Sequence, residues 1–212
     1  MENAVDVCIV ITNQNQGLFL ERCIRSCLAQ TFPGRFHEVL VVDAGSSDFS
    51  REVIRSYGNK IVPILMDDAH DGLEEATCAG IRRSKGRYVL QIRAQDFISD
   101  YMILFQAIWL YQNPKHDGVS VDCWMVDHET DAKVKRICGL TSCYGTMYRK
   151  EVLVKEGLYE AQVKDWTPER LQKRLDGRYE IGHLPIPFYR YQQEQQLTDT
   201  ASPLDSPSHR RR

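Results

Sequence analysis

Short apolar runs alternate with amphipathic stretches through the first hundred residues of the chain. The apolar runs are continuous and rich in β-branched residues, which is typical of strands buried on both faces of a parallel sheet. The stretches between them carry apolar residues at helical spacing. The predicted strands are residues 5–12, 39–42, 61–66 and 87–92, and the predicted helical faces fall within 20–28, 53–57 and 73–81. This order predicts an α/β fold with a mostly parallel sheet flanked by helices.

Three polar loops follow the predicted strands. They are residues 13–17, 43–48 and 93–96, and they share one edge of the predicted sheet. Ligands of such sheets bind outside the carboxyl ends of the strands, so we expect the chemistry of the protein in these loops. Asp48, at the end of the second loop, is expected to cap the helix that follows it.

The second half of the chain has a less regular pattern. Residues 99–112 are apolar nearly all round, which predicts a buried helix. Shorter strands, some of them antiparallel, are predicted at 119–126, 133–137, 144–148 and 179–184, and a further helix at 169–175. The last residues are polar and rich in Ser and Pro, which predicts a disordered tail over 194–212.

Length and charge restrict the class of protein. The 212 residues fit a single domain, here 1–193, with a hydrophobic core of its own. The 27 basic and 29 acidic residues give a net charge of −2, so we expect no nucleic-acid partner. The longest apolar run, 101–111, is well short of the ~20 residues of a membrane span. We also expect no signal peptide, because no basic region followed by an apolar stretch opens the chain.

The seven cysteines form neither a Cys-x-x-Cys pair nor a dense disulfide framework. This favours a reducing compartment and a cytoplasmic protein. Cys23 and Cys27 lie four residues apart on one predicted helix face. A zinc site needs four ligands, so we interpret these thiols as small apolar core residues. The acidic stretch 67–71 (DDAHD) is interpreted as a solvated loop rather than a metal site.

The segments VDVCIVITNQNQG and HEVLVVDAGSSD resemble the opening motifs of family 2 glycosyltransferases. The resemblance continues at GRYVLQIRAQDFIS, YGTMYRKEVLVKEGLYE, KDW and RYEIGHLPIPFYRYQQ, and therefore covers nearly the whole chain to about residue 193. It implies a glycosyltransferase A fold, in which a nucleotide-binding half, 1–98, joins a mixed acceptor half, 99–193.

The resemblance also implies an activity. A glycosyltransferase of this family moves a sugar from a nucleoside diphosphate sugar to an acceptor hydroxyl, here with inversion at the anomeric carbon. The acceptor would be a glycan, a lipid-linked molecule or a small molecule. An inverting enzyme needs a base for the acceptor hydroxyl, and the resemblance assigns this role to Asp165. The alternative for Asp165 is an ordinary acidic residue at the start of a helix.

The resemblance assigns donor binding to residues in the three polar loops. They are Thr12, Asn13, Gln14, Asp43, Arg93, Gln95 and Asp96. Several depart from the family pattern: Gln14 stands where an aromatic residue stacks on the base, and Ala44 replaces the Asp that contacts uracil. Two structural alternatives stay open. Thr12 and Asn13 could serve the turn alone, and Asp43 could be a carboxylate that accepts hydrogen bonds from its own loop.

The loop 93–96 reads Arg-Ala-Gln-Asp where the family has Asp-Ala-Asp-Asp. A hard cation prefers anionic oxygen ligands, and Gln95 supplies only a neutral carbonyl. Metal ligands are therefore not assigned: Mn or Mg is left open as a cofactor, and Asp96 is left as a ligand for a weakly held metal or a ribose hydroxyl. Arg93 has two interpretations. Its guanidinium replaces the metal at the diphosphate, or it points to solvent or pairs with Asp96.

Two classes of function remain. The first is an active, metal-independent glycosyltransferase, and the second is a catalytically degenerate relative that binds a ligand or a partner protein. The changes at Gln14, Ala44 and Gln95 motivate the second. The loop 93–96 separates them, because a collapsed or occluded loop would count against the binding of a nucleotide as well.

Overall fold

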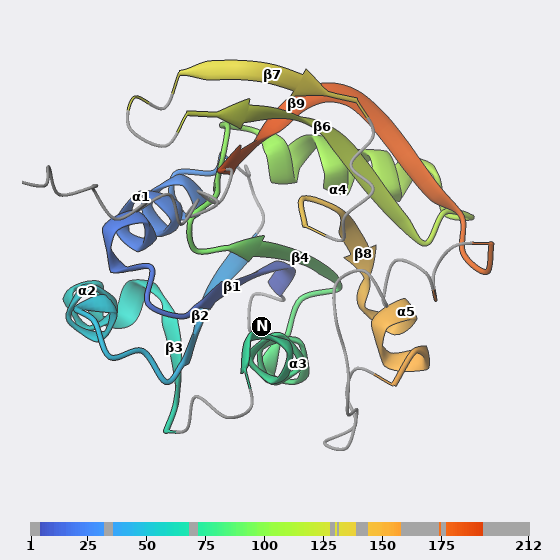
Figure 1. Ribbon diagram of the computed structural model, residues 1–212. Helices are drawn as coiled ribbons and strands as arrows, with labels where there is room; N and C mark the ends of the chain where they lie inside the picture. The colour runs from blue at the N-terminus through green and yellow to red at the C-terminus, as the bar shows by residue number, and fades with distance from the viewer. Residues whose placement is uncertain are drawn as a thin grey trace, which may run out of the picture.

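The computed structural model describes residues 5–31, 36–67, 72–127, 130, 132–138, 144–157, 174 and 177–192. Within these ranges the chain forms one nine-stranded sheet with helices packed on it (Figure 1). Several expectations lie outside the described residues. These concern Asp165, residues 68–71, the predicted helix 169–175 apart from Arg174, and the predicted tail 194–212.

The first half of the sheet is parallel. It consists of β1 (Val5–Asn13), β2 (Phe36–Ala44), β3 (Val62–Met66) and β4 (Tyr88–Arg93). β2 and β4 pair with the two sides of β1, and β3 pairs with β2. All four predicted strands are confirmed. Their parallel pairing brings the loops that follow β1, β2 and β4 to one edge of the sheet.

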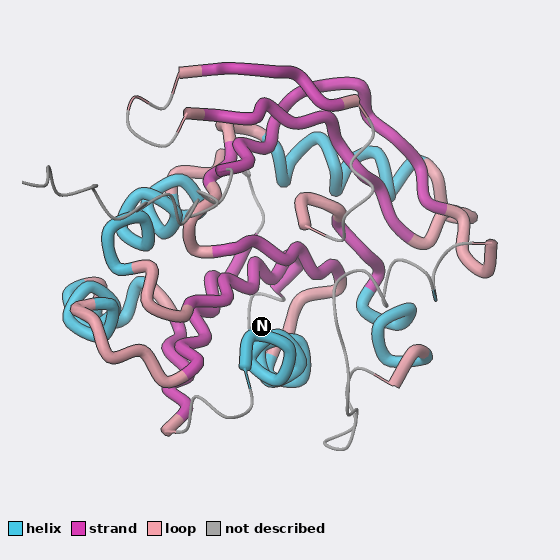
Figure 2. The backbone as a smooth tube through the Cα atoms, in the orientation of Figure 1, coloured by secondary structure: helices cyan, strands magenta, loops and turns pink. Residues whose placement is uncertain are grey.

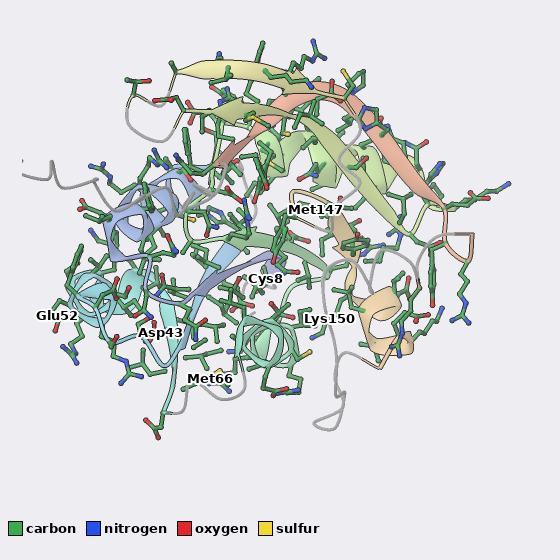
Figure 3. The ribbon with its side chains drawn as sticks, in the orientation of Figure 1. Cys8, Asp43, Glu52, Met66, Met147 and Lys150 are labelled. Carbon is green, nitrogen blue, oxygen red and sulfur yellow. The ribbon has the colours of Figure 1, made fainter. Side chains whose placement is uncertain are left out.

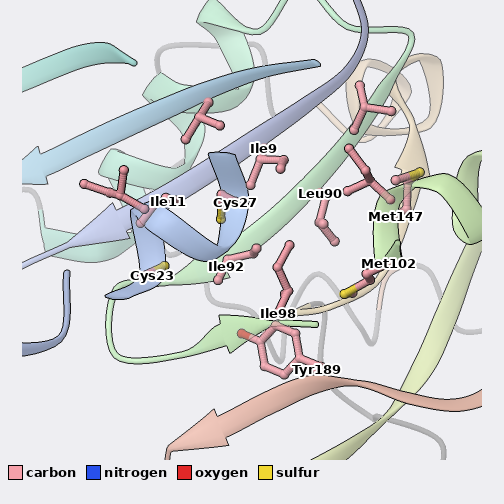
Figure 4. Close-up of a cluster of buried hydrophobic side chains, with 14 of the residues drawn as sticks. Ile9, Ile11, Cys23, Cys27, Leu90, Ile92, Ile98, Met102, Met147 and Tyr189 are labelled. Atoms are coloured by element: carbon pink, nitrogen blue, oxygen red, sulfur yellow. The ribbon is translucent and has the colours of Figure 1, made fainter. Parts of the chain in front are cut away.

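Helices cover both faces of this parallel half. They are α1 (Gly17–Leu28), α2 (Ser50–Ser56), the short 3₁₀ helix η1 (Gly58–Lys60) and α3 (Gly72–Arg83). Successive side chains of β1 enter two different cores, since strand side chains alternate between the faces. Ile9 and Ile11 pack with Cys23 and Cys27 of α1 (Figure 4), whereas Val10 packs against α3. The interpretation of Cys23 and Cys27 as core residues is therefore confirmed.

The second half is mixed, as predicted. Its elements are β5 (Phe97–Ile98), α4 (Met102–Gln112), β6 (Gly118–Val126), β7 (Lys133–Ile137), β8 (Met147–Arg149), α5 (Lys150–Lys155) and β9 (Ile181–Gln192). The strand order is β3-β2-β1-β4-β8-β6-β9-β5, with β7 also paired to β6. β8 is antiparallel to β4 and β6, and β9 is parallel to β6. The sheet curls so that β6, β7 and β9 lie over α4 (Figure 2).

The prediction that residues 99–112 form a buried helix is confirmed for the helix but only in part for its burial. The helix begins at Met102, and it packs against β6 and β9 along one side only. Ile108 and Tyr111, on the other side, are 46% and 69% exposed, and Phe105, whose ring centroid lies 5.5 Å from that of Phe188 on β9, is still 46% exposed. Hydrophobic composition alone cannot show which side of such a helix finds a partner.

Two strand predictions need correction. Residues 144–148 were expected to be extended, but Tyr144 and Gly145 form a turn and β8 begins at Met147. The strand predicted over 179–184 continues to Gln192, although proline cannot donate a ladder hydrogen bond. The register of β9 against β6 shifts around Asp122, where Pro187 lies, and this irregularity accommodates the prolines.

Candidate functional site

The three polar loops meet at the carboxyl ends of β1, β2 and β4. Asn13 lies opposite Asp43 in the β1–β2 ladder, and Thr12 lies opposite Arg93 in the β1–β4 ladder. Residues that are 30 and 81 positions apart in the sequence are thus neighbours. All the donor-binding residues expected from the sequence come together here, and only the expected base, Asp165, lies outside the described residues.

Asp43 is the centre of a buried polar cluster. Its Oδ1 accepts hydrogen bonds from Asn13 Nδ2 at 2.8 Å and from the Ser46 hydroxyl at 2.5 Å. Its Oδ2 accepts from the Ser46 amide at 3.1 Å and forms an ion pair with Arg51 Nε at 2.9 Å. Arg51 also donates to the carbonyl of Met66, so it ties α2 to the ends of β2 and β3. These contacts are those expected of a structural carboxylate at Asp43, which Figure 3 labels, and its role in donor binding stays a prediction.

Asp48 joins the starts of two helices. Its Oδ2 accepts from the amide of Gly17, the first residue of α1, at 2.9 Å. Its Oδ1 accepts from the amide of Ser50, the first residue of α2, also at 2.9 Å. Burial would raise the pKa of Asp48, but the hydrogen bonds from Ser50 and Gly17 outweigh it and lower the pKa. The capping role is observed, although Phe49 rather than Asp48 occupies the N-cap position of α2.

Gln14 and Thr12 complete the first two loops. The Gln14 side chain is half-buried, and its Nε2 donates to the carbonyl of Ala44 at 3.1 Å. Gln14 therefore lies beside the position where the family pattern has a base-contacting carboxylate. Thr12 is 3% exposed, and its carbonyl accepts from the amide of Ala94 at 3.0 Å. This contact links the first loop to the loop 93–96.

Arg93 and Asp96 form a bidentate ion pair at the end of β4. Arg93 Nε donates to Asp96 Oδ2 at 2.8 Å, and Arg93 Nη2 donates to Asp96 Oδ1 at 3.1 Å. Asp96 is fully buried and accepts two further hydrogen bonds, from the Tyr189 hydroxyl at 2.6 Å and from the Gln192 amide at 2.8 Å. Four donors thus share the two oxygens of this one carboxylate.

Aromatic rings enclose the Arg93 guanidinium. Its central carbon lies 4.5 Å from the ring centroid of Tyr191 and 5.4 Å from that of Tyr144. The side chain is 13% exposed, so it does not point freely into solvent. Burial alone would lower the pKa of Arg93, but the charge of Asp96 and its hydrogen bonds raise the pKa above its ordinary value. The pairing of Arg93 with Asp96 is thus observed, and the role of Arg93 at the diphosphate stays a prediction.

Three residues of this network were not predicted as site residues: Tyr189, Gln192 and Arg22. Tyr189 is fully buried, and burial together with the nearby Asp96 charge raises the pKa of its hydroxyl. Arg22 Nη2 donates to the carbonyl of Gln95 at 3.0 Å and to Gln192 Oε1 at 2.9 Å. The end of β9 is therefore bound to the loop 93–96. A buried tyrosine beside polar residues at the end of an apolar strand was the available signal, but its partner could not be deduced from the sequence.

This arrangement defines the class of the protein. A nucleotide-binding type of parallel half, with its loops at the carboxyl edge, is joined to a mixed half that closes over it, which is the glycosyltransferase A fold. The sequence model of Glycosyl transferase family 2 matches residues 8–158. The chain belongs to this family.

Similar proteins agree with this assignment. Glycosyltransferase AglE of Haloferax volcanii is 33% identical over 82 residues, which are 38% of this chain and 27% of AglE. The structure of S. aureus TarS 1-349 in complex with UDP-GlcNAc has a TM-score of 0.72 at 16% identity, covering 90% of this chain and 59% of that one. Mannosyltransferase PcManGT from Pyrobaculum calidifontis, in complex with GDP-Man and Mn²⁺, has a TM-score of 0.68 at 17% identity, covering 92% and 61%.

The chain spans only part of the length of these proteins, about a quarter of AglE and about three fifths of the two solved chains. The two structural matches are below one fifth in sequence identity, so they establish the fold. Among the helices that the structure describes, none is long and apolar enough to cross a membrane.

The residues at the end of β4 do not fit the divalent metal that the family implies. Both oxygens of Asp96 are occupied by four donors, and a guanidinium stands 2.8 Å away where a second cation would have to approach. Gln95 offers no charge, and its backbone carbonyl accepts from Arg22. Within the described ranges, no three His, Cys, Asp or Glu side chains converge on one point. A hard cation requires anionic oxygens that are available for coordination.

Proposed function

We propose that this chain is a cytoplasmic, inverting glycosyltransferase that transfers a sugar from a nucleoside diphosphate sugar to the hydroxyl of a glycan, lipid-linked or small-molecule acceptor. The observation that carries the proposal is the convergence of three polar loops at the carboxyl edge of β1, β2 and β4 in a chain of this family. The complexes of TarS with UDP-GlcNAc and of PcManGT with GDP-Man support a nucleotide-sugar donor. The thiols of Cys8, Cys23, Cys27 and Cys123 are buried and outside any disulfide, which is consistent with a reducing compartment.

The donor site is assigned to the first two loops and the end of β4. Asn13, Asp43 and the buried Thr12 hold the loop geometry of the donor site, and the half-buried Gln14 side chain is the group offered to the nucleoside. The Gln14 amide can both donate to and accept from a base, so it is compatible with uracil and with guanine. The Asp43 cluster fixes the end of β2 beside it, which keeps the donor pocket preorganised.

We propose that the transfer proceeds without a carboxylate-held metal. An arginine–aspartate pair has no net charge, as is true of a divalent cation between two carboxylates. Arg93 therefore supplies the cationic group at this position, and Asp96 fixes its orientation towards the diphosphate leaving group. Tyr191 and Tyr144 hold the guanidinium plane from the side of the acceptor half.

Deprotonation of the acceptor hydroxyl is assigned to Asp165, on the resemblance alone. One positioned carboxylate is sufficient for general base catalysis and contributes roughly 10²–10⁴-fold in rate. Asp165→Asn is expected to lower turnover by this factor while the affinity for the nucleoside diphosphate stays the same. An unchanged turnover number would remove Asp165 from the mechanism.

The test of the donor site is a calorimetric titration with uridine and guanosine diphosphates, each with manganese and with a chelator. We expect one of them to bind with the same affinity in both conditions. Turnover is then measured with the matching nucleotide sugar in chelator. A strict requirement for added manganese would overturn the metal-independent mechanism, and no binding of either nucleotide would overturn the donor site.

A second function is favoured by one observation. Asp96 is buried and saturated, and Gln95 replaces the other acid, so the usual acidic motif has no group left for chemistry. This suits a protein that binds a nucleotide or a partner without turnover. Donor binding without hydrolysis or transfer from uridine, guanosine and thymidine diphosphate sugars, in a folded chain, would favour this function over the first.

A further inference from the structure

Aromatic and cationic side chains alternate across four adjacent strands on the outer face of the acceptor half. Phe97 on β5 is in register with Arg190 on β9, Arg190 with Trp124 on β6, and Trp124 with Arg136 on β7. We call these four residues, together with Arg22 and Lys133 at the two ends, the cation–aromatic row. Neighbouring strands lie about 4.8 Å apart, so the row presents one side chain at each such interval.

The row faces away from the core. Each strand has a neighbouring residue that is in register with its counterparts on the adjacent strands and belongs to the hydrophobic core over α4. These residues are Ile98, Tyr189, Cys123 and Ile137. Side chains alternate between the faces of a sheet, so the row lies on the opposite face. No described helix packs over β6 and β7 on this side, as Figure 1 shows.

The two ends of the row extend the pattern. The Arg22 guanidinium lies 4.3 Å from the ring centroid of Phe97, and Lys133 Nζ lies 5.5 Å from that of Trp124. Arg136 pairs with Asp122 at 2.6 Å, yet its side chain remains 41% exposed. Asp122 itself is buried and also contacts His183 at 2.9 Å. Four cations thus surround two rings, in a chain whose net charge is −2.

One end of the row meets the candidate site. Phe97 directly follows Asp96, and Arg22 donates to Gln95 and Gln192, which belong to the network at the end of β4. A chain molecule lying along the row would therefore have one end beside the donor loops and would extend from there across β9, β6 and β7.

We propose that the cation–aromatic row binds an anionic glycan and guides it to the donor site. Arginine and lysine bind carboxylate or phosphate groups, and aromatic faces pack against the apolar faces of sugar rings. The inference rests on the proposed function, and it narrows the acceptor to a glycan that carries negative charge. Single-stranded nucleic acid uses similar chemistry, and the membership of the chain in a glycosyltransferase family favours the glycan.

The test measures the binding of the full chain to a galacturonic acid decasaccharide, to its neutral methyl ester and to a deoxythymidine decanucleotide. We expect the charged decasaccharide to bind most tightly, with an affinity that falls as salt is added. Trp124→Ala and the pair Lys133→Gln with Arg190→Gln are each expected to weaken this binding ~5-fold or more.

Two substitutions away from the row serve as controls. Tyr111→Ala removes an aromatic ring that is 69% exposed on α4, and Lys60→Gln removes an exposed cation on η1. Both should bind the decasaccharide as the unchanged chain does. Equal binding of the methyl ester, equal losses in the controls, unchanged binding in the row variants, or tighter binding of the oligonucleotide would each overturn the proposal.

Nucleotide titrations in the same variants separate this inference from the proposed function. The row variants are expected to bind the nucleoside diphosphate with unchanged affinity, because none of the substituted residues is among the proposed donor-binding residues. If the glycan binds and no nucleotide does, the proposed function fails while the row stands. If the nucleotide binds and the charged glycan does not, the row fails while the proposed function stands.

Discussion

At the scale of the residue, Asp96 is a buried carboxylate whose ion pair holds its loop together. The carboxylate is fully buried, and its charge is balanced by Arg93, three residues earlier. Removing one member of a buried pair leaves the other without compensation, which costs far more than removing both. The loop 93–96 therefore depends on the arginine for its fold, whatever the arginine does for the donor.

Arg93→Gln is expected to lower the free energy of unfolding by about 3 kcal/mol, because it leaves the buried Asp96 charge with hydrogen bonds alone. The double variant Arg93→Gln with Asp96→Asn should lose clearly less, since both members are then neutral. Urea denaturation of the two single variants and the double variant measures the coupling. A double variant that loses the sum of the two single effects would contradict this account of the pair.

The environment of His37, on β2, leads us to expect that the stability of the folded chain depends on pH. Its Nε2 contacts the carbonyl of Cys27 at 3.2 Å, and burial lowers its pKa below the ordinary value of 6.5, although this contact acts in the opposite direction. The folded chain therefore binds the proton less readily than the unfolded chain. The contribution of neutral His37 to the free energy of unfolding is therefore fully present above about pH 6.5, and it is lost as the pH falls below this value.

We expect the melting temperature of the chain to fall between pH 7.5 and pH 5.5, and to fall less in His37→Gln. Glutamine can still donate to the Cys27 carbonyl but does not titrate. The difference between the two proteins is the measurement, because the other histidines contribute equally to both. Identical pH profiles would show that His37 is protonated as easily in the folded state as in the unfolded state.

At the scale of the element, the approach of α3 to β1 is set by a single glycine. A Cβ atom at Gly80 would overlap Val10 Cγ1 and would lie 3.0 Å from Val42 Cγ2. Both valines belong to the core beneath the helix, so neither can move into solvent. Elsewhere in a helix, alanine is more favourable than glycine by about 1 kcal/mol. At Gly80 the steric overlap therefore opposes the gain in helix propensity.

Gly80→Ala is expected to lower the free energy of unfolding by about 1–3 kcal/mol, because overpacking outweighs the gain in helix propensity. Gly58→Ala in η1 is the comparison, since it has open space around it and only a positive φ of 54° to oppose it. Chemical denaturation of both variants distinguishes crowding from backbone strain. A more stable Gly80→Ala chain would mean that α3 shifts away from the sheet at little cost.

At the scale of the whole molecule, the two halves are joined at the end of β4. β9 returns from the far side of the sheet and delivers Tyr189 and Gln192 to Asp96. A donor bound at the edge of β1, β2 and β4 would therefore touch loops held by both halves. Ligands that bind only the folded chain stabilise it by mass action, by about 2.7 kcal/mol at a concentration 100 times the dissociation constant.

The nucleoside diphosphate that binds in the titration is expected to raise the melting temperature by roughly 5–10 °C at that concentration. The same increase is expected in manganese and in chelator. Arg93→Gln with Asp96→Asn should show a smaller increase, because the cation that we propose for the diphosphate is gone. An increase seen only with manganese would show that a metal takes part in donor binding.

The sequence by itself determined the parallel half and its edge. Continuous β-branched runs and helical spacing located four strands and three helices, since burial on both faces and amphipathic packing leave these local patterns. The polar loops at the strand ends then followed from parallel topology. Thr12, Asn13, Gln14 and Arg93 could be placed at one edge before any contact was known.

Only the tertiary structure decided which groups of that edge neutralise each other. Two partners of Asp96, Tyr189 and Gln192, come from β9, 93 and 96 residues away, and no local pattern records such a pairing. The same holds for the exposed side of α4, whose composition matches that of a buried helix. The cation–aromatic row likewise exists only through strand register. Local patterns fix which face of an element is apolar, whereas long-range packing fixes what that face and its polar neighbours meet.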